Sequence, residues 1–197
     1  MRLRHVLAVV TIFTPALAAV PARAGDAAVE LQRQADRVVS VLADRDREPA
    51  ERQRQVRAIV SEAFDFEAAA RRALGRAWGE RTPDERATFV RLFFDLLDRA
   101  YLRRLDSMDG QRIVVAGDVI EADRATVHTA IVAGDGERTP VDYRMRRAAG
   151  GRWRVVDVSV GGASLLGNYR AQFARLMQQG GFAHLMERLQ AKVASLQ

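Results

Sequence analysis

The spacing of apolar residues in this chain changes from a helical period to a strand period and then back again. Up to about residue 105, apolar residues recur every three or four positions, which is typical of amphipathic helices. Between residues 112 and 160 they alternate with polar residues, and helical spacing returns after residue 164. We therefore predict an α+β fold of N-terminal helices, an antiparallel sheet and C-terminal helices, packed around a single core.

Four segments have the pattern of strands. Alternation is clearest at Val141, Tyr143 and Met145, whose polar neighbours would face water. Gly-Asp pairs and an AAGG turn separate the segments, so the connections are short and an antiparallel meander of four strands is expected. The segments are RIVVAG (112–117), RATVHTAIVAG (124–134), PVDYRMRR (140–147) and RWRVVDVSV (152–160).

The helices are bounded by recognisable start and stop signals. Thr82 is followed by a proline and, three residues on, by Glu85, which together predict the start of a central helix that runs to about Leu105. Earlier helices are expected over residues 27–44, from Pro49 to residue 63, and over 64–75. The first of these would bury a stripe made of Leu31, Ala35, Val38, Val39 and Leu42. The last two helices are expected on either side of the Gly180-Gly181 break.

The N-terminus has the features of a secretory signal. Arg2 and Arg4 precede residues 6–20, which carry no charge, and Ala22-Arg23-Ala24 fits a signal-peptidase site. We predict a signal peptide over residues 1–24, cleaved after Ala24, followed by one domain over residues 25–197 in the periplasm. An uncleaved N-terminal anchor is the alternative.

Charge and cysteine content exclude several classes of function. Loss of Arg2, Arg4 and Arg23 with the signal peptide lowers the formal net charge from +6 to +3, and no basic run remains, so no nucleic-acid partner is expected. The chain has no cysteine, which rules out disulfides, thiol nucleophiles and thiolate metal sites. It also rules out a lipoprotein anchor, which requires a cysteine at the cleavage point.

Ser164 lies at a strand-to-helix turn, where a serine can be a nucleophile or a helix cap. A nucleophile elbow requires G-x-S-x-G, but here the second glycine, Gly167, comes one residue too late. His184 is the only histidine after Ser164, and no carboxylate lies between the two. We therefore predict that Ser164 caps the helix that begins at Leu165.

The remaining polar candidates give no catalytic pattern. Neither His128 nor His184 belongs to a recognised metal-binding motif, so neither a metal site nor a cofactor is expected. Asp157 lies within an apolar strand, on the face of Trp153 and Val155, and a buried carboxylate there would need a partner such as an arginine.

Several stretches over about residues 55–195 carry a family resemblance: FDFEAAARRALGRAW, TPDERATFVRLFFDLLDRAYLRRL, PVDYRMRR, WRVVDVSVGGASLLGNYRAQF and the closing helices. In these stretches the sequence resembles the MlaC/Ttg2D family of periplasmic phospholipid-binding proteins of the Mla (toluene-tolerance) system, whose superfamily includes hopanoid-associated proteins. Gly161-Gly162 departs from it, since relatives often have a glutamate before the glycine. Positions that match the motif are Asp142, Tyr143, Arg144, Asp157, Ser164, Leu165, Asn168, Tyr169, Arg170 and Phe173.

The resemblance implies an NTF2-like sheet beside a deep apolar cavity, and a soluble monomer without catalytic residues. Such a protein would shuttle phospholipid, or a hopanoid, between an outer-membrane lipoprotein complex and an inner-membrane ABC-transporter complex. An apolar slot suffices for a carrier because each buried methylene contributes about 0.8 kcal/mol of transfer free energy. The residues expected to line the slot are Phe93, Leu97, Tyr101, Tyr143, Met145, Val158, Leu165, Tyr169 and Phe173.

Two other hypotheses remain open from the sequence. An enzyme could use the same cavity, with His128, Asp142 or Asp157 as its acid or base, and one of these groups would then have a perturbed pKa inside the pocket. A periplasmic adaptor or chaperone would instead have a fully packed core and no cavity.

Overall fold

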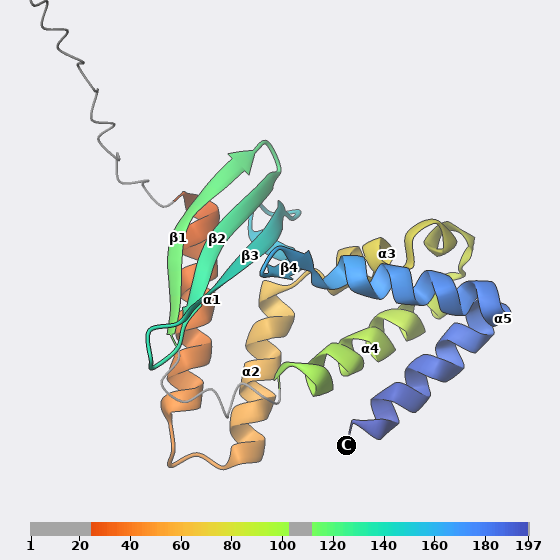
Figure 1. The fold of residues 1–197 in the computed structure, drawn as a ribbon, viewed down its shortest axis with the longest axis horizontal. Coiled ribbons are helices and arrows are strands. Elements are labelled where there is room, and N and C mark those ends of the chain that lie inside the picture. The colour runs from red at the N-terminus through yellow and green to blue at the C-terminus, as the bar shows by residue number, and fades with distance from the viewer. Residues whose placement is uncertain (1–24, 103–111, 197) are drawn as a thin grey trace, which may run out of the picture.

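The computed structural model describes residues 25–102 and 112–196 and confirms the α+β fold (Figure 1). The predicted signal peptide and the end of the predicted central helix, at Leu105, lie outside the described residues. The helices are α1 (Asp26–Ala43), α2 (Pro49–Ala63), α3 (Phe66–Leu74), α4 (Pro83–Ala100) and α5 (Leu165–Ser195), with a 3-10 helix, η1 (Gly75–Glu80), after α3. The strands are β1 (Arg112–Glu121), β2 (Arg124–Val132), β3 (Arg138–Arg147), β4 (Trp153–Val160) and β5 (Ala163–Ser164).

Local capping explains why several helices start where they do. Thr82 and Glu85 form the predicted capping box at the start of α4, each side chain accepting a backbone N–H of the other residue. The first helix has no such signal of its own. Instead Asp118 of β1 accepts hydrogen bonds from the backbone N–H groups of Gly25 (2.8 Å) and Ala28 (2.9 Å), so a distant strand caps α1.

The sheet is the predicted antiparallel meander, with the order β1-β2-β3-β4-β5. Four strands were expected, and the fifth is the two-residue segment Ala163–Ser164, which pairs with the end of β4. It was missed because two residues are too few to show alternation.

A bulge in β4 corrects the predicted faces of that strand. Arg144 pairs with Asp157, but Met145 pairs with Val155, so Val156 is an extra residue in the ladder. Because side chains alternate along a strand, this insertion reverses the faces on its two sides. Asp157 is therefore on the opposite face from Trp153 and Val155, whereas strict alternation placed all three together.

Most of the buried apolar residues form two clusters, where the sequence pattern predicted one core. The helix cluster consists of residues from α3, η1, α4 and α5, including Phe89, Phe93 and Phe173. The sheet cluster consists of Ala27, Ala28 and Leu31 of α1 against residues of β2, β3 and β4. Figure 1 shows the corresponding arrangement, with the sheet and α1 on one side of the molecule and α3, α4 and α5 on the other.

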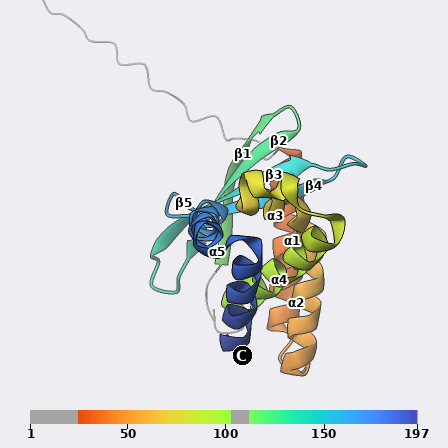
Figure 2. The ribbon, with the colours of Figure 1, turned by 90° about the vertical axis from the view of Figure 1, so that its right-hand side faces the viewer.

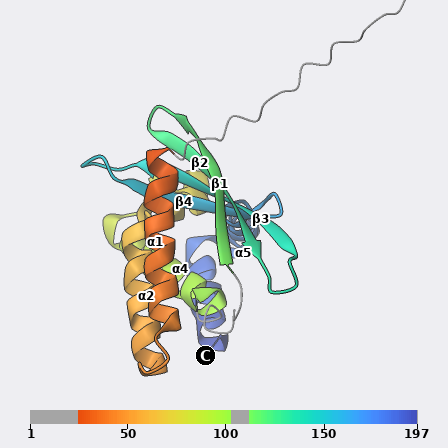
Figure 3. The same ribbon diagram turned by 90° about the vertical axis from the view of Figure 1, so that its left-hand side faces the viewer.

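The helix α2 connects these two parts. It lies alongside α1 (Figure 3), and its end pairs with β4 where Asp65 N–H donates to the carbonyl of Val155 (2.8 Å). On its other side Arg57 forms ion pairs with Asp95 (2.7 Å) and Asp98 (2.6 Å) of α4. The ring centroids of Phe66 and Phe94 lie 4.1 Å apart, which adds an aromatic contact between α3 and α4.

The predicted break at Gly180-Gly181 is present as a sharp bend within α5. Gly180 and Gly181 have non-helical dihedral angles, and φ of Gly181 is +70°. The bend turns the second half of the helix back alongside the rest of the helical part (Figures 1 and 2). Leu185 and Leu189 thereby join the helix cluster.

Candidate functional site

Five of the nine predicted wall residues belong to the helix cluster. Phe93 is 1% exposed, and its ring packs edge-on against those of Tyr169 (5.1 Å between centroids) and Phe173 (5.3 Å). Leu97 is buried in the same cluster, and Leu165 is partly buried against it. These side chains form a packed aromatic and aliphatic layer between α4 and the first half of α5.

Tyr101 is the most exposed of the nine, at 47%. Burial and a hydrogen bond with Tyr101 raise the pKa of the Tyr169 phenol well above its ordinary value. The tyrosine pair therefore links the end of α4 to α5 at the edge of the helix cluster.

Tyr143, Met145 and Val158 belong to the sheet cluster. Met145 is fully buried, whereas Tyr143 and Val158 are partly buried against the same cluster. Burial raises the pKa of the Tyr143 phenol, so the hydroxyl stays neutral in apolar surroundings. Eight of the nine residues are thus brought to two apolar layers, one on the helices and one on the sheet, and Tyr101 lies at the edge of the first.

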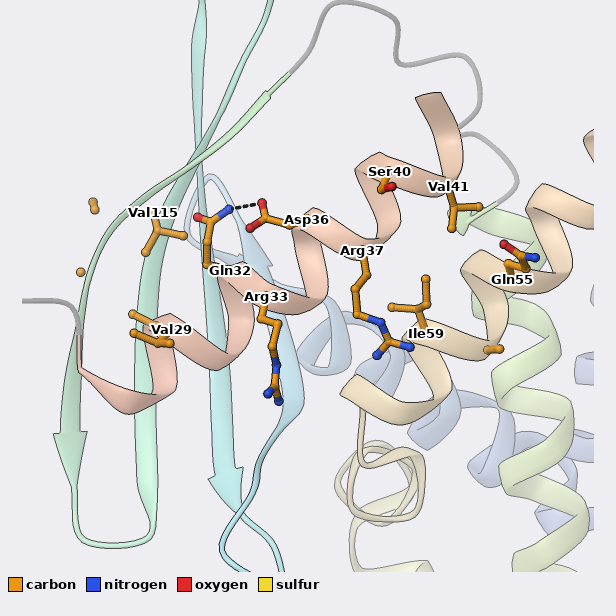
Figure 4. A pocket seen from close by; sticks show the side chains of 14 residues that line it. Val29, Gln32, Arg33, Asp36, Arg37, Ser40, Val41, Gln55, Ile59 and Val115 are labelled. Carbon is orange, nitrogen blue, oxygen red and sulfur yellow. Dashed lines mark hydrogen bonds between the residues drawn. The ribbon is translucent and has the colours of Figure 1, made fainter. Parts of the chain in front are cut away.

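A pocket of about 1000 Å³ lies between α1, α2 and β1 (Figure 4). Its apolar surface includes Val29, Val41, Ile59 and Val115, and polar side chains of α1 stand around it. Figure 4 shows Arg33 and Arg37 extending from one side of α1, while Gln32 donates a hydrogen bond to Asp36 (2.7 Å). Such a mixture of apolar lining and a few charged groups is common in pockets for amphiphilic ligands.

None of the nine predicted residues lines this pocket, although the pocket borders the sheet cluster. Ala28 and Val115 line the pocket and also pack with the cluster that contains Tyr143 and Val158. The pocket was not predicted because it forms where α1, α2 and β1 meet, and the α1 residues that line it lie outside the predicted core stripe. One member of that stripe, Val39, is 53% exposed, and only Leu31 of its five residues is fully buried.

Asp157 and Ser164 form a hydrogen-bonded junction between β4 and α5. Ser164 accepts a hydrogen bond from Gly167 N–H (2.9 Å), as predicted for a cap, and its hydroxyl donates to Asp157 Oδ2 (2.7 Å). Asp157 Oδ1 accepts from the backbone N–H groups of Val158 (2.9 Å) and Leu166 (3.2 Å). The expected arginine partner is Arg144, at 3.1 Å, with Arg72 at 3.9 Å. Both carboxylate oxygens are occupied in fixing the start of α5.

The other acid–base candidates lie at the surface. His128 is exposed and Asp142 is half-buried, and Nδ1 of His128 lies 2.8 Å from Oδ1 of Asp142. Within residues 25–102 and 112–196, no group of three or more His, Asp or Glu side chains is placed to hold a metal ion. In the same residues no helix has the length and hydropathy of a membrane span.

The fold and the pocket define an α+β domain with two apolar layers and a pocket beside one of them. A family model described as "MlaC protein" matches residues 32–191, and the chain belongs to this MlaC family. Among solved structures, it is similar to a phospholipid-binding protein from Ralstonia solanacearum determined in complex with a phospholipid. The two share 26% sequence identity and a TM-score of 0.78, over 87% of this chain and 99% of that one. No curated protein matches the chain.

Proposed function

We propose that this protein is a periplasmic phospholipid carrier that shields acyl chains from water and catalyses no reaction. The observation that carries the proposal is its membership of the MlaC family together with its similarity to a structure that holds a phospholipid. The predicted signal peptide supports the location, because cleavage after Ala24 would release the domain into the periplasm. Delivery between an outer-membrane lipoprotein complex and an inner-membrane ABC-transporter complex is the role that we expect for it, as a monomer.

In this proposal the acyl chains lie against the two apolar layers. The helix layer contributes Phe93, Leu97, Leu165, Tyr169 and Phe173, with Tyr101 at its edge, and the sheet layer contributes Tyr143, Met145 and Val158. Shielding one long chain from water supplies on the order of 10 kcal/mol of transfer free energy, so apolar contact alone can retain the ligand.

The pocket between α1, α2 and β1 gives the ligand a route to the sheet layer, because Ala28 and Val115 belong to both. Arg33 and Arg37 stand beside this pocket (Figure 4) and could meet a phosphate, since guanidinium groups bind phosphate oxygens through paired hydrogen bonds. The polar head group would then remain in water while the chains are buried.

The first experiment is the identification of lipid that copurifies with the protein. The protein is expressed with its own N-terminus, purified from the periplasm without detergent, extracted with solvent and analysed by mass spectrometry. We expect near-stoichiometric glycerophospholipid. A hopanoid would retain the carrier function but change its ligand, and a folded protein without lipid would contradict the proposal.

Single substitutions test the two apolar layers. Tyr143→Asp and Leu97→Asp place a charge in the sheet layer and the helix layer, and we expect each to abolish lipid retention because burying an unpaired charge is costly. Val39→Asp, at an exposed position of α1 outside the pocket, is the matched control and should keep its lipid. Circular dichroism checks that each variant is folded. Wild-type lipid content in a folded Tyr143→Asp or Leu97→Asp variant would remove that residue from the wall.

A further inference from the structure

A second concave surface, distinct from the pocket beside α1, lies between α3 and the sheet. It has a volume of about 840 Å³ and is formed by residues from α3 and from all four long strands. Figure 2 shows α3 next to β3 and β4. We call this surface the arginine groove, because it is lined by Arg71, Arg72, Arg124, Arg144, Arg146 and Arg154.

The groove carries a net positive charge. Its acidic lining residues are Asp65, Glu67 and Glu121, which balance only half of the arginines. A concave surface with one prevailing sign of charge concentrates the electrostatic potential above it, because the low-dielectric walls focus the field. The groove is therefore attractive to an anionic ligand.

Four of the arginines are already engaged in holding the fold. Arg146 pairs with Asp65 (2.7 Å), while Arg144 and Arg72 approach Asp157. Arg154 donates to the carbonyls of Ser61 and Phe64. These contacts hold the four arginine side chains in place on the walls of the groove. The exposed parts of their guanidinium groups therefore keep a fixed orientation.

The other two arginines are available for a ligand. Arg71 of α3 and Arg124 of β2 are both exposed, and neither side chain has a hydrogen bond or ion pair with the residues in 25–102 and 112–196. Val119, also in the groove, is 53% exposed and offers apolar contact beside them. Two free guanidinium groups with an exposed valine fit a peptide-like segment that carries carboxylates, which arginine binds in a bidentate manner.

We propose that the arginine groove is a docking site for an acidic segment of a partner protein. A concave shape admits a protruding segment, whereas a flat anionic membrane would meet the rim of the groove. The proposal goes beyond lipid binding and does not depend on which apolar ligand the protein carries.

A direct test uses a fluorescently labelled peptide of about eight glutamates, with a glutamine peptide of the same length as the control. Binding is measured by fluorescence anisotropy at low ionic strength. We expect saturable binding of the glutamate peptide alone, weakened by added salt because exposed charges are screened over about 10 Å at 0.1 M. Failure of the glutamate peptide to bind would overturn the proposal.

Charge reversal locates the binding. Arg71→Glu/Arg124→Glu changes the two unpaired arginines and should weaken peptide binding by about tenfold or more. The matched control is Arg91→Glu/Arg175→Glu, which makes the same change at exposed positions on α4 and α5 outside the groove. An equal loss in both variants would show attraction to net charge and would overturn the docking site.

Two competitors separate the docking site from other anion sites. Inorganic phosphate that displaces the peptide at equal concentration would indicate a small-anion site, and vesicles with anionic lipid that bind through Arg71 and Arg124 more tightly than the peptide would indicate a membrane surface. Either result would overturn the proposal. Lipid content measured on the same variants should stay unchanged, which keeps this test separate from that of the carrier function.

Discussion

At the scale of single residues, two acidic side chains join elements that are distant in the sequence. Asp157 links β4 to the first turn of α5 through Ser164 and Leu166, and its side chain is fully buried. Asp65 caps α3 by accepting from Ala68 N–H (3.0 Å) and pairs with Arg146 of β3. In both cases arginines from the sheet compensate the charge of a partly or fully buried carboxylate.

The Asp65 contacts make part of the stability dependent on pH. Burial alone would raise the pKa of Asp65, but the hydrogen bond from Ala68 and the ion pair with Arg146 outweigh it and lower that pKa below its ordinary value. Because the folded-state pKa is the lower one, this stabilisation is present above the unfolded-state pKa of about 4 and is lost as the pH falls through the folded-state pKa.

We therefore predict that Asp65→Asn lowers the free energy of unfolding by about 1 kcal/mol near neutral pH, and that the difference shrinks below about pH 4. Urea denaturation between pH 3 and pH 7 measures this. Asp123→Asn, at an exposed turn position without a side-chain partner in residues 25–102 and 112–196, is the control and should show no such trend. A difference for Asp65→Asn that is independent of pH would contradict the assignment.

At the scale of elements, the bend in α5 depends on a backbone conformation that few residues adopt. Gly181 has φ of +70° and ψ of −165°, a region that is almost restricted to glycine. The bend allows one long helix to contribute Phe173 from its first half and Leu185 from its second half to the same cluster. The backbone conformation of Gly181 is therefore needed for both halves of α5 to pack in the helix cluster.

Gly181→Ala should lower the free energy of unfolding by about 1–3 kcal/mol, because an alanine at this conformation is strained even though open space surrounds the position. Gly79→Ala is a matched control, since Gly79 has no restrictive φ and no neighbour within 4 Å of an added Cβ. Thermal unfolding of the two variants compares them directly. Equal stability would show that the bend does not require glycine.

At the scale of the whole molecule, the apolar residues form two layers that α2 and the start of α5 hold together. Ion pairs of Arg57 and the junction at Asp157 connect these layers at particular points. If phospholipid lies against both layers, as proposed, it adds contacts to the folded state and stabilises it by mass action.

We expect delipidated protein to remain folded and to unfold at a lower temperature than lipid-loaded protein. At a free ligand concentration a hundred times Kd the stabilisation is about 2.7 kcal/mol, which corresponds to roughly 5–10 °C for a domain of this size. Differential scanning calorimetry before and after removal and readdition of phospholipid measures the shift. Identical transitions in the two forms would contradict binding to the folded state.

Local patterns in the sequence were sufficient for most of the secondary structure. The capping box at Thr82, the cap at Ser164 and the alternation around Tyr143 are each determined by residues within a few positions of one another. The family resemblance was likewise carried by contiguous motifs, and it is confirmed by the match over residues 32–191.

Features that depend on distant partners could not be predicted. Asp118 caps α1 from a strand about ninety residues away, and the bulge at Val156 follows from the pairing of β4 with β3. Apolar spacing marks a residue as suited to burial but does not say which layer it joins, so eight of the nine predicted wall residues divide between two clusters.

The sequence by itself thus determined the order of helices and strands, the helix ends with local caps and the family, because these depend on neighbouring residues. The tertiary structure alone decided the reversed faces of β4, the exposed side of α1 with its pocket, and the gathering of arginines from α3 and three strands into one groove. These features arise where separate elements meet, and the geometry of that meeting is set by packing of the whole chain.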